Sequence, residues 1–196
     1  MKRIAIFASG TGTNAENLIR YFRTNPFGRV VLVLSNKPAA GVLEKASDLG
    51  VETCAFERRQ FYETRDVLKL LKDRGIDFIV LAGFLWLVPE YLLDAFHGRV
   101  INIHPALLPK YGGKGMYGRH VHEAVLRNGE KESGITIHQV NPEYDEGDVV
   151  FQARCEVQPG DTPETLASRI HELEYAHFPA VVEQLLKGLP GSDVHS

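Results

Sequence analysis

Asn102 and His104 stand two positions apart at the end of a short, mostly apolar segment, residues 99–104. Such a segment predicts a buried strand, and residues two positions apart in a strand point to the same side. An amide and an imidazole would then project together from one face, just before a loop rich in proline and glycine. The spacing indicates a catalytic pair at the carboxyl edge of a sheet. The alternative is a polar strand end that hydrogen-bonds a loop.

An acidic turn later in the chain supplies a partner for this pair. The segment NPEYDEGDVVF places Asp145, Glu146 and Asp148 in a glycine-containing turn before another strand. A carboxylate beside an imidazole orients the ring and favours its protonated form. We therefore expect an acid of this turn to raise the pKa of His104 above its ordinary value of about 6.5. Acidic turns are also common surface features without any catalytic role.

The segment ASGTGTNAENL joins the first predicted strand to the first predicted helix. Gly10, Gly12 and Ala15 match the G-x-G-x-x-A pattern of dinucleotide-binding loops. Such sites carry an acid about 20 residues further on, at the end of the second strand, where residues 35–36 are Ser and Asn. The pattern therefore favours a single phosphate monoester over a dinucleotide, with a capped tight turn as the structural alternative.

The physical chemistry of this loop also favours an anion. A residue without a Cβ, such as Gly12, lets the backbone approach a ligand closely. The N-terminus of the following helix presents free N–H groups to a negative charge. Thr13 and Asn14 add side-chain donors, so we expect a phosphate group at residues 12–14.

The elements that must position these residues alternate along the first hundred residues. Short β-branched runs predict strands at residues 3–8, 30–35, 52–55, 78–82 and 99–104, and periodic apolar residues predict helices at 14–23, 39–49 and 59–74. Continuous apolar strands separated by helices are typical of a parallel sheet covered on both faces. We therefore expect an α/β, Rossmann-like domain with a mostly parallel sheet.

The second half of the chain has a different pattern. A helix is expected at 120–127, and strands at 134–140 and 149–157 follow without a helix between them, which predicts an antiparallel hairpin. A long helix at 161–186 would begin with a capping box of Asp161 and Glu164 and would be kinked or divided at Pro179. We expect one domain, residues 1–187, followed by a frayed tail, residues 188–196.

Composition and short patterns argue against several classes of function. A formal net charge of −3 gives no general attraction to nucleic acid or anionic lipid. The apolar run before Ser9 is too short for a signal sequence or a membrane span. Cys54 and Cys155 lack metal-like spacing and fit a reducing compartment, so we expect a cytoplasmic protein. His120 and His122 would point in nearly opposite directions on a helix, so no metal site is expected.

Four motifs, SGTGTN, LAGF, INIHPALLPKYGGKG and DEGD, occur in this order along the chain. Together they resemble the folate-dependent formyltransferases, over the whole chain. The resemblance implies transfer of the formyl group of 10-formyltetrahydrofolate to the amine of glycinamide ribonucleotide in purine biosynthesis, by direct attack through a tetrahedral intermediate. It further implies small-molecule substrates, 10-formyltetrahydrofolate as co-substrate without a metal, no nucleic acid or membrane partner, and a monomer or homodimer.

The resemblance also implies site residues. The catalytic residues would be Asn102, His104 and Asp145, and the substrate would contact Gly12, Thr13, Asn14, Pro105 and Glu174, the last at its ribose hydroxyls. The folate would contact Leu85, Trp86, Leu87, Val88, Asn102, Asn141 and Tyr144, with Arg59 at its glutamate tail. Trp86 and His171 depart from the family, in which Arg and Lys are frequent at these positions. Asn102 and a protonated His104 would donate to the oxyanion, with Asp145 keeping the imidazole charged.

Three other functions remain as alternatives. A methionyl-tRNA formyltransferase shares the chemistry but resembles a longer chain with a tRNA-binding domain. A formyltetrahydrofolate deformylase uses the same three residues for hydrolysis and usually carries a regulatory domain before the first strand, which is expected here at residue 3. The third alternative is not an enzyme but a module that binds a nucleotide or folate without catalysis. The presence of all three catalytic residue types disfavours it.

Overall fold

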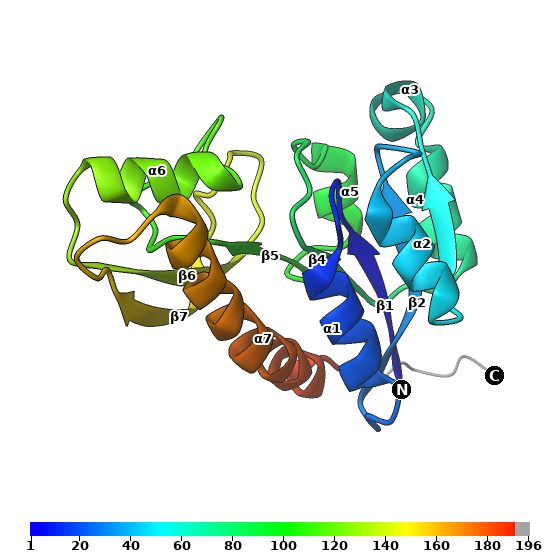
Figure 1. Cartoon of the computed structure of the whole chain (residues 1–196). Helices are drawn as coiled ribbons and strands as arrows, with labels where there is room; N and C mark the ends of the chain where they lie inside the picture. Colours follow the sequence, from blue (N-terminus) through cyan, green and yellow to red (C-terminus); the bar gives the residue numbers. More distant parts are fainter. Residues whose placement is uncertain (191–196) are drawn as a thin grey trace.

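The computed structural model describes residues 1–190 of the 196-residue chain. Its centre is a seven-stranded sheet in the order β3-β2-β1-β4-β5-β6-β7 (Figure 1). The strands are β1 (Lys2–Phe7), β2 (Gly28–Ser35), β3 (Glu52–Ala55), β4 (Phe78–Leu81), β5 (Val100–His104), β6 (Glu132–Gln139) and β7 (Val149–Glu156). The first five strands are parallel, whereas β6 runs antiparallel to β5 and β7. The predicted α/β class, with a mostly parallel sheet and a C-terminal antiparallel hairpin, is confirmed.

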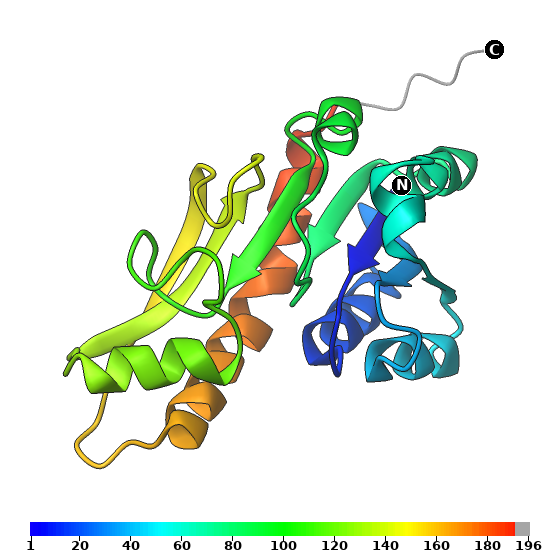
Figure 2. The same cartoon turned by 90° about the horizontal axis from the view of Figure 1, so that it is seen from above.

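Helices cover both faces of the sheet, because the side chains of each central strand alternate between two apolar clusters. In β1, Ile4 and Ile6 lie in one cluster, and Ala5 and Phe7 lie in the other. The first cluster includes residues of α1 (Thr13–Phe22), α2 (Gly41–Asp48), α6 (Arg119–Arg127) and α7 (Pro163–Gly188). The second includes residues of α3 (Arg58–Tyr62), α4 (Asp66–Asp73) and α5 (Glu90–Ala95). In Figure 2 the long α7, in orange and red, runs past the antiparallel strands that it contacts.

The order of the strands reverses between β1 and β4. The chain moves from β1 outward to β2 and β3, and then returns to β4 on the other side of β1. In open α/β sheets, ligands bind beyond the carboxyl ends of the strands at such a reversal. The loop after β1, the loop after β4 and the end of β5 meet at this edge, and they carry the SGTGTN, LAGF and INIHP motifs.

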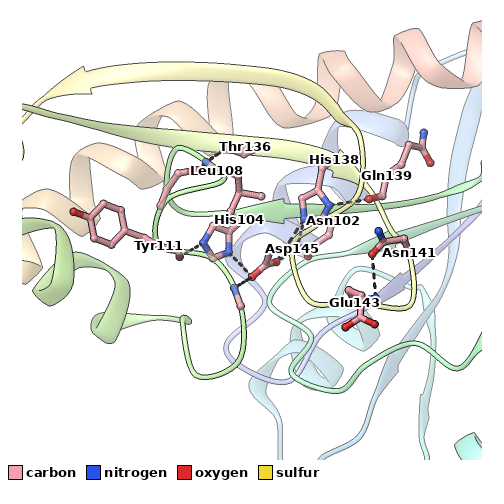
Figure 3. A network of polar contacts seen from close by, with 12 residues as sticks. Asn102, His104, Leu108, Tyr111, Thr136, His138, Gln139, Asn141, Glu143 and Asp145 are labelled. Atoms are coloured by element: carbon pink, nitrogen blue, oxygen red, sulfur yellow. Dashed lines mark hydrogen bonds and ion pairs between the residues drawn. The ribbon is translucent and has the colours of Figure 1, made fainter.

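The pairing of β5 with β6 sets the neighbours of the polar strand end. Asn102 lies opposite His138, and His104 lies opposite Thr136. Side chains of directly opposed residues in an antiparallel pair share one face of the sheet. The connection between β6 and β7, residues 140–148, contains Asp145 and returns past the carboxyl end of β5 (Figure 3). The hairpin therefore brings the acidic turn to the polar residues of β5.

One prediction for the short helices was wrong, and one short helix had not been predicted. The helix expected at 59–74 is two helices, α3 and α4. Arg65 between them has a left-handed φ of 58°, and the Thr64 hydroxyl donates to the Asp66 carboxylate at 2.7 Å, a local contact that competes with helical hydrogen bonding. The six-residue α5 was not predicted, because so short a helix shows less than two turns of apolar periodicity.

The start of α7 also differs from the prediction. Its capping box is formed by Thr162 and Thr165, not by Asp161 and Glu164. Asp161 instead accepts two hydrogen bonds from the guanidinium of Arg169, at 2.9 and 3.0 Å. A bidentate Arg–carboxylate pair is stronger than a neutral cap, so this contact takes the carboxylate.

Pro179 does not divide α7, which is continuous from Pro163 to Gly188. A proline inside a helix leaves the carbonyl four residues earlier without its N–H partner. That carbonyl, of Tyr175, accepts a hydrogen bond from the side-chain amide of Asn17 on α1 at 3.2 Å. The predicted division between domain and tail at residue 188 stays a prediction. Gly188 ends α7, and residues 191–196, with His195, lie outside the described residues.

Candidate active site

A cleft of about 860 Å³ opens at the carboxyl ends of β1, β4 and β5, a volume suited to small molecules. Its walls come from segments far apart in the sequence: three loops, a strand end, a glycine-rich segment and two helices. The lining residues are 10–14, 82–85, 102–105, 113–119, His122, Tyr144, Asp145, Pro163, Glu164, Ala167, His171 and Glu174. The predicted catalytic trio and the predicted phosphate loop therefore share one cavity.

Asp145 lies at the centre of a polar network in this cleft (Figure 3). Its Oδ2 accepts a hydrogen bond from the backbone N–H of Gly113 at 3.0 Å and lies 3.5 Å from Nδ1 of His104. Its Oδ1 lies 3.4 Å from Nδ2 of Asn102 and 3.6 Å from Nε2 of His138. Asp145 adopts a φ of 58°, which is uncommon for a residue with a side chain. The structure thus brings Asn102, His104 and Asp145 together.

The hydrogen-bond partners of His104 indicate which ring nitrogen carries the proton. Its Nε2 lies 2.7 Å from the carbonyl oxygen of Tyr111, and a carbonyl can only accept, so Nε2 carries a hydrogen. In the neutral ring, Nδ1 then offers only a lone pair to the Asp145 carboxylate, which accounts for their separation of 3.5 Å. Uptake of one proton at Nδ1 would convert this contact into a charge-assisted hydrogen bond.

Burial lowers the pKa of His104 below its ordinary value, and the Asp145 carboxylate and the Tyr111 carbonyl only partly oppose this effect. The predicted rise in this pKa was therefore wrong for the free protein. The side chain is only 4% exposed. The free energy that the imidazolium loses with its hydration is larger than the free energy that it gains from the Asp145 carboxylate.

Asp145 differs from His104 in that its surroundings favour the charged form of the side chain. Burial raises its pKa, but the contacts with His138 and His104 and the hydrogen bond from the N–H of Gly113 together lower it, so the net pKa lies below the ordinary value. Asp145 is therefore ionised at neutral pH. The free site holds a carboxylate beside a neutral imidazole, one proton short of the predicted ion pair.

His138, for which only a surface or structural role was predicted, also belongs to this network. Its Nδ1 lies 2.8 Å from the carbonyl oxygen of Gln139 and donates to it, which leaves Nε2 to accept from Nδ2 of Asn102 at 3.1 Å. His138 thereby orients the amide of Asn102 with its nitrogen toward Asp145. The available signal was the alternation of polar and apolar residues in β6, combined with a predicted antiparallel neighbour.

The amide of Asn102 is less free than predicted. One of its hydrogens is held by His138 at 3.1 Å, whereas the other makes only a long contact, 3.4 Å, with Asp145. Hydrogen bonds weaken as the donor–acceptor distance grows beyond about 3.2 Å. Only the second hydrogen can therefore turn to a ligand without breaking a good hydrogen bond.

The predicted phosphate loop leads into α1, with Gly12 as the N-cap residue at a φ of 75°. A Cβ added to Gly12 would lie 2.7 Å from the Cα of Val42 in α2. Packing against α2 and a left-handed backbone thus require this glycine, in addition to the close ligand approach expected from its lack of a Cβ. Thr13 and Asn14 line the cleft beside it.

Glu174, the predicted ribose contact, lies on α7 and is only 4% exposed. Its Oε2 accepts hydrogen bonds from Nδ2 of Asn14 at 2.9 Å and from Nδ1 of His171 at 2.8 Å. The hydrogen bond to Glu174 raises the pKa of His171, against the effect of burial. His171 can therefore supply positive charge at a position where the family frequently has Lys.

The predicted folate segment lies only partly in the cleft. Leu85 and Tyr144 line the cavity, as does Pro105. The ring of Trp86 lies about 6 Å from the rings of four aromatic residues in the second core region: Phe56, Phe61, Tyr62 and Phe84. Val88 is buried in the same region, and the Leu87 carbonyl accepts from the Tyr62 hydroxyl at 2.8 Å.

Two further predicted folate contacts do not line this cleft. Arg59 lies on α3 with its side chain 76% exposed, beside Glu63. Asn141 accepts a hydrogen bond from the backbone N–H of Glu143 at 3.0 Å and so stabilises its own turn. Arg59 thus projects into solvent, whereas a local hydrogen bond holds Asn141.

Within residues 1–190, no group of three or more His, Cys, Asp or Glu residues could hold a metal ion. His120 is exposed and His122 is buried, so the two side chains of α6 point apart as predicted. None of the helices described is long and apolar enough to cross a membrane.

The sequence and the fold are similar to known proteins. Residues 2–182 match the formyl transferase family. The chain is 40% identical over 196 residues to the chloroplastic phosphoribosylglycinamide formyltransferase of Arabidopsis thaliana, covering 95% of this chain and 67% of that one. It is 36% identical to the phosphoribosylglycinamide formyltransferase of Bacillus subtilis, with 95% of each chain covered. The crystal structure of phosphoribosylglycinamide formyltransferase from Bacillus halodurans matches with a TM-score of 0.85 at 37% identity, over 95% of this chain and 96% of that chain.

Proposed function

The chain belongs to the formyl transferase family, and from this premise we infer that it transfers the formyl group of 10-formyltetrahydrofolate to the amine of glycinamide ribonucleotide in purine biosynthesis. The relatives in Arabidopsis thaliana and Bacillus subtilis are named phosphoribosylglycinamide formyltransferases. The observation that carries the inference is the network of Asn102, His104 and Asp145, which shares a cleft with the loop at residues 10–14.

We propose that the substrate lies along the cleft with its phosphate at the N-terminus of α1. The backbone N–H groups at Gly12, Thr13 and Asn14 would bind the phosphate, because a helix N-terminus favours an anion. Glu174 would accept hydrogen bonds from the ribose. This places the substrate amine at the polar network of Asp145. The folate would enter past Leu85 and Tyr144, which line the same cleft.

The proposed reaction starts with a proton transfer. An α-amino group has a pKa of about 7.7–8.0, so the substrate amine arrives largely protonated and must lose a proton before it attacks. The neutral His104 beside the ionised Asp145 accepts this proton at Nδ1, directly or through a water molecule. The substrate thus supplies the proton that the free site lacks, and His104 becomes a cation held by Asp145.

The amine nitrogen then bonds to the formyl carbon, and the electrons of the C=O double bond move to oxygen. The weakly held amide hydrogen of Asn102 donates to this oxyanion. The positive charge of the His104 imidazolium, whose two N–H groups face Tyr111 and Asp145, stabilises the oxyanion electrostatically. Loss of one such interaction typically costs about 3–4 kcal/mol in the transition state. When the intermediate collapses, the bond to the folate nitrogen breaks, and that nitrogen takes a proton released by the attacking amine, with Asp145 as the relay. His104 then loses its proton to solvent as the products leave, which restores the neutral ring.

We further propose that the enzyme acts in the cytoplasm on these two small molecules, as a monomer or homodimer, without nucleic acid or membrane partners. The proposed chemistry requires no metal, since the developing charge is met by His104 and Asn102. The co-substrate 10-formyltetrahydrofolate supplies the carbon that is transferred.

An assay of tetrahydrofolate release tests the proposed function. Purified protein with 10-formyltetrahydrofolate should release tetrahydrofolate only when glycinamide ribonucleotide is added. Release without the amine would identify a deformylase instead. Release that requires charged initiator tRNA would identify a methionyl-tRNA formyltransferase.

A further inference from the structure

His122 is a buried residue of the cleft to which the proposed reaction assigns no role. It lies on α6, which packs beside α7, and it is only 4% exposed. Among the residues that the structure describes, its Nδ1 is enclosed and has no hydrogen-bond partner. Because the side chain nevertheless lines the cleft, Nε2 is the ring nitrogen that can meet a ligand there.

The neutral ring of His122 presents a hydrogen-bond donor at Nε2. Burial lowers the pKa of His122, and the nearby His171 and His104 lower it further, so the ring is neutral at pH 7. A neutral imidazole carries one hydrogen, on one of its two nitrogens. An enclosed N–H without an acceptor is rarer and more costly than an enclosed lone pair. The hydrogen therefore lies on Nε2, which faces the cleft.

Glu174 offers the complementary group on the neighbouring helix. Both side chains line the same cleft, one from α6 and one from α7, and these two helices pack against each other. A ligand group between them must accept from the N–H of His122 and donate to the carboxylate. A hydroxyl does both. A phosphate oxygen would be repelled by Glu174, and an ammonium group would meet the N–H of His122.

We propose that His122 is a specificity-determining residue that, together with Glu174, recognises one hydroxyl of the substrate's ribose. The N–H of His122 donates to the hydroxyl oxygen, and the hydroxyl donates to the Glu174 carboxylate. This inference rests on the proposed function, whose substrate carries two such hydroxyls. It predicts that the enzyme distinguishes a ribose from a deoxyribose at this position.

Three variants test the donor at position 122. His122→Phe keeps the size of the ring and removes the donor, whereas His122→Gln places an amide N–H near the position of Nε2. His120→Phe is the matched control, because His120 lies on the same helix with its side chain 64% exposed. At saturating 10-formyltetrahydrofolate, His122→Phe should raise KM for glycinamide ribonucleotide by about 3- to 10-fold with kcat unchanged, as for a lost neutral hydrogen bond. His122→Gln should lie nearer the wild type, and His120→Phe should match it.

Substrates that lack the 2′- or the 3′-hydroxyl complete the experiment. For one of the two, KM of the wild-type enzyme should already be raised by a similar factor, and His122→Phe should add little to it, because both changes remove the same contact. The inference would be overturned if His122→Phe raised KM by the same factor for glycinamide ribonucleotide and for both deoxy substrates. It would also be overturned if His122→Phe left KM for glycinamide ribonucleotide unchanged. If thermal unfolding shows that His122→Phe is poorly folded, His122→Gln provides the test instead. A KM of His122→Gln for glycinamide ribonucleotide far above that of the wild type would overturn the proposal. A wild-type enzyme without turnover of glycinamide ribonucleotide would contradict the proposed function itself.

Discussion

Replacement of Asp145 by Asn removes the negative charge beside His104 while keeping the shape of the side chain. A carboxylate offers two acceptor oxygens, whereas an amide offers one oxygen and one NH₂ group. The NH₂ group would face the N–H of Gly113 on one side or the amide of Asn102 on the other. The Asp145→Asn variant therefore loses a charge and gains one contact between two donors.

The distance of 3.5 Å between Nδ1 of His104 and Oδ2 of Asp145 gives the scale of the effect. Two unit charges at this separation attract by about 5 kcal/mol at an effective dielectric constant of about 20. Without this attraction the pKa of His104 falls further, and the ring no longer takes the proton of the amine. Loss of an oxyanion donor typically lowers kcat by about 10²–10³-fold, or ~3–4 kcal/mol. This loss is smaller than the calculated attraction between the two charges, so removal of the Asp145 charge can account for it. We expect such a fall in kcat, with little change in either KM.

Steady-state kinetics with both substrates measure this effect. Asp148→Asn is the matched control, because Asp148 is an exposed acid of the same turn, and its kcat should equal that of the wild type. His104→Ala should reduce kcat far less in the Asp145→Asn background than alone, because residues that act as a unit are not additive. Additive losses in this cycle, or an equal loss in Asp148→Asn, would refute the coupling of Asp145 to His104.

Three further predictions concern stability and the walls of the cleft. Gly12→Ala should lower the free energy of unfolding in urea by about 1–3 kcal/mol, since the new Cβ meets α2 at a φ of 75°, whereas Gly10→Ala, which meets open space, should change nothing. Burial lowers the pKa of both His104 and His122. Their contribution to stability is therefore present above the unfolded pKa of about 6.5 and is lost as the pH falls below it. Thermal melts should show this decline on acidification, with a shallower slope in His122→Phe, and a flat profile would contradict it. Trp86→Leu should lower the free energy of unfolding by about 2 kcal/mol but leave KM for 10-formyltetrahydrofolate unchanged. A raised KM for 10-formyltetrahydrofolate would show that Trp86 contacts the folate.

Local sequence patterns were sufficient to predict the architecture and part of the site. Continuous apolar strands separated by helices require a parallel sheet covered on both faces, because hydrophobic periodicity is a local property of the chain. The common direction of Asn102 and His104 follows from the two-residue repeat of a strand. Where local signals are short or compete with polar contacts, as in α3, α4 and α5, the same reasoning misplaced or missed the helices.

The groups that surround these residues depend on the packing of the folded chain and could not be predicted from local patterns. His138 joined the network because β6 pairs with β5 in one register, and that register depends on segments about 35 residues apart packing together. Trp86 does not line the cleft, and aromatic side chains from α3 and the loop before it surround its ring, a packing that depends on segments far apart in the sequence. The pKa of His104 is lowered, opposite to the prediction, because all the segments packed around the ring together remove water from it. A local pattern can place a carboxylate beside an imidazole, but the loss of water around both is a property of the folded chain.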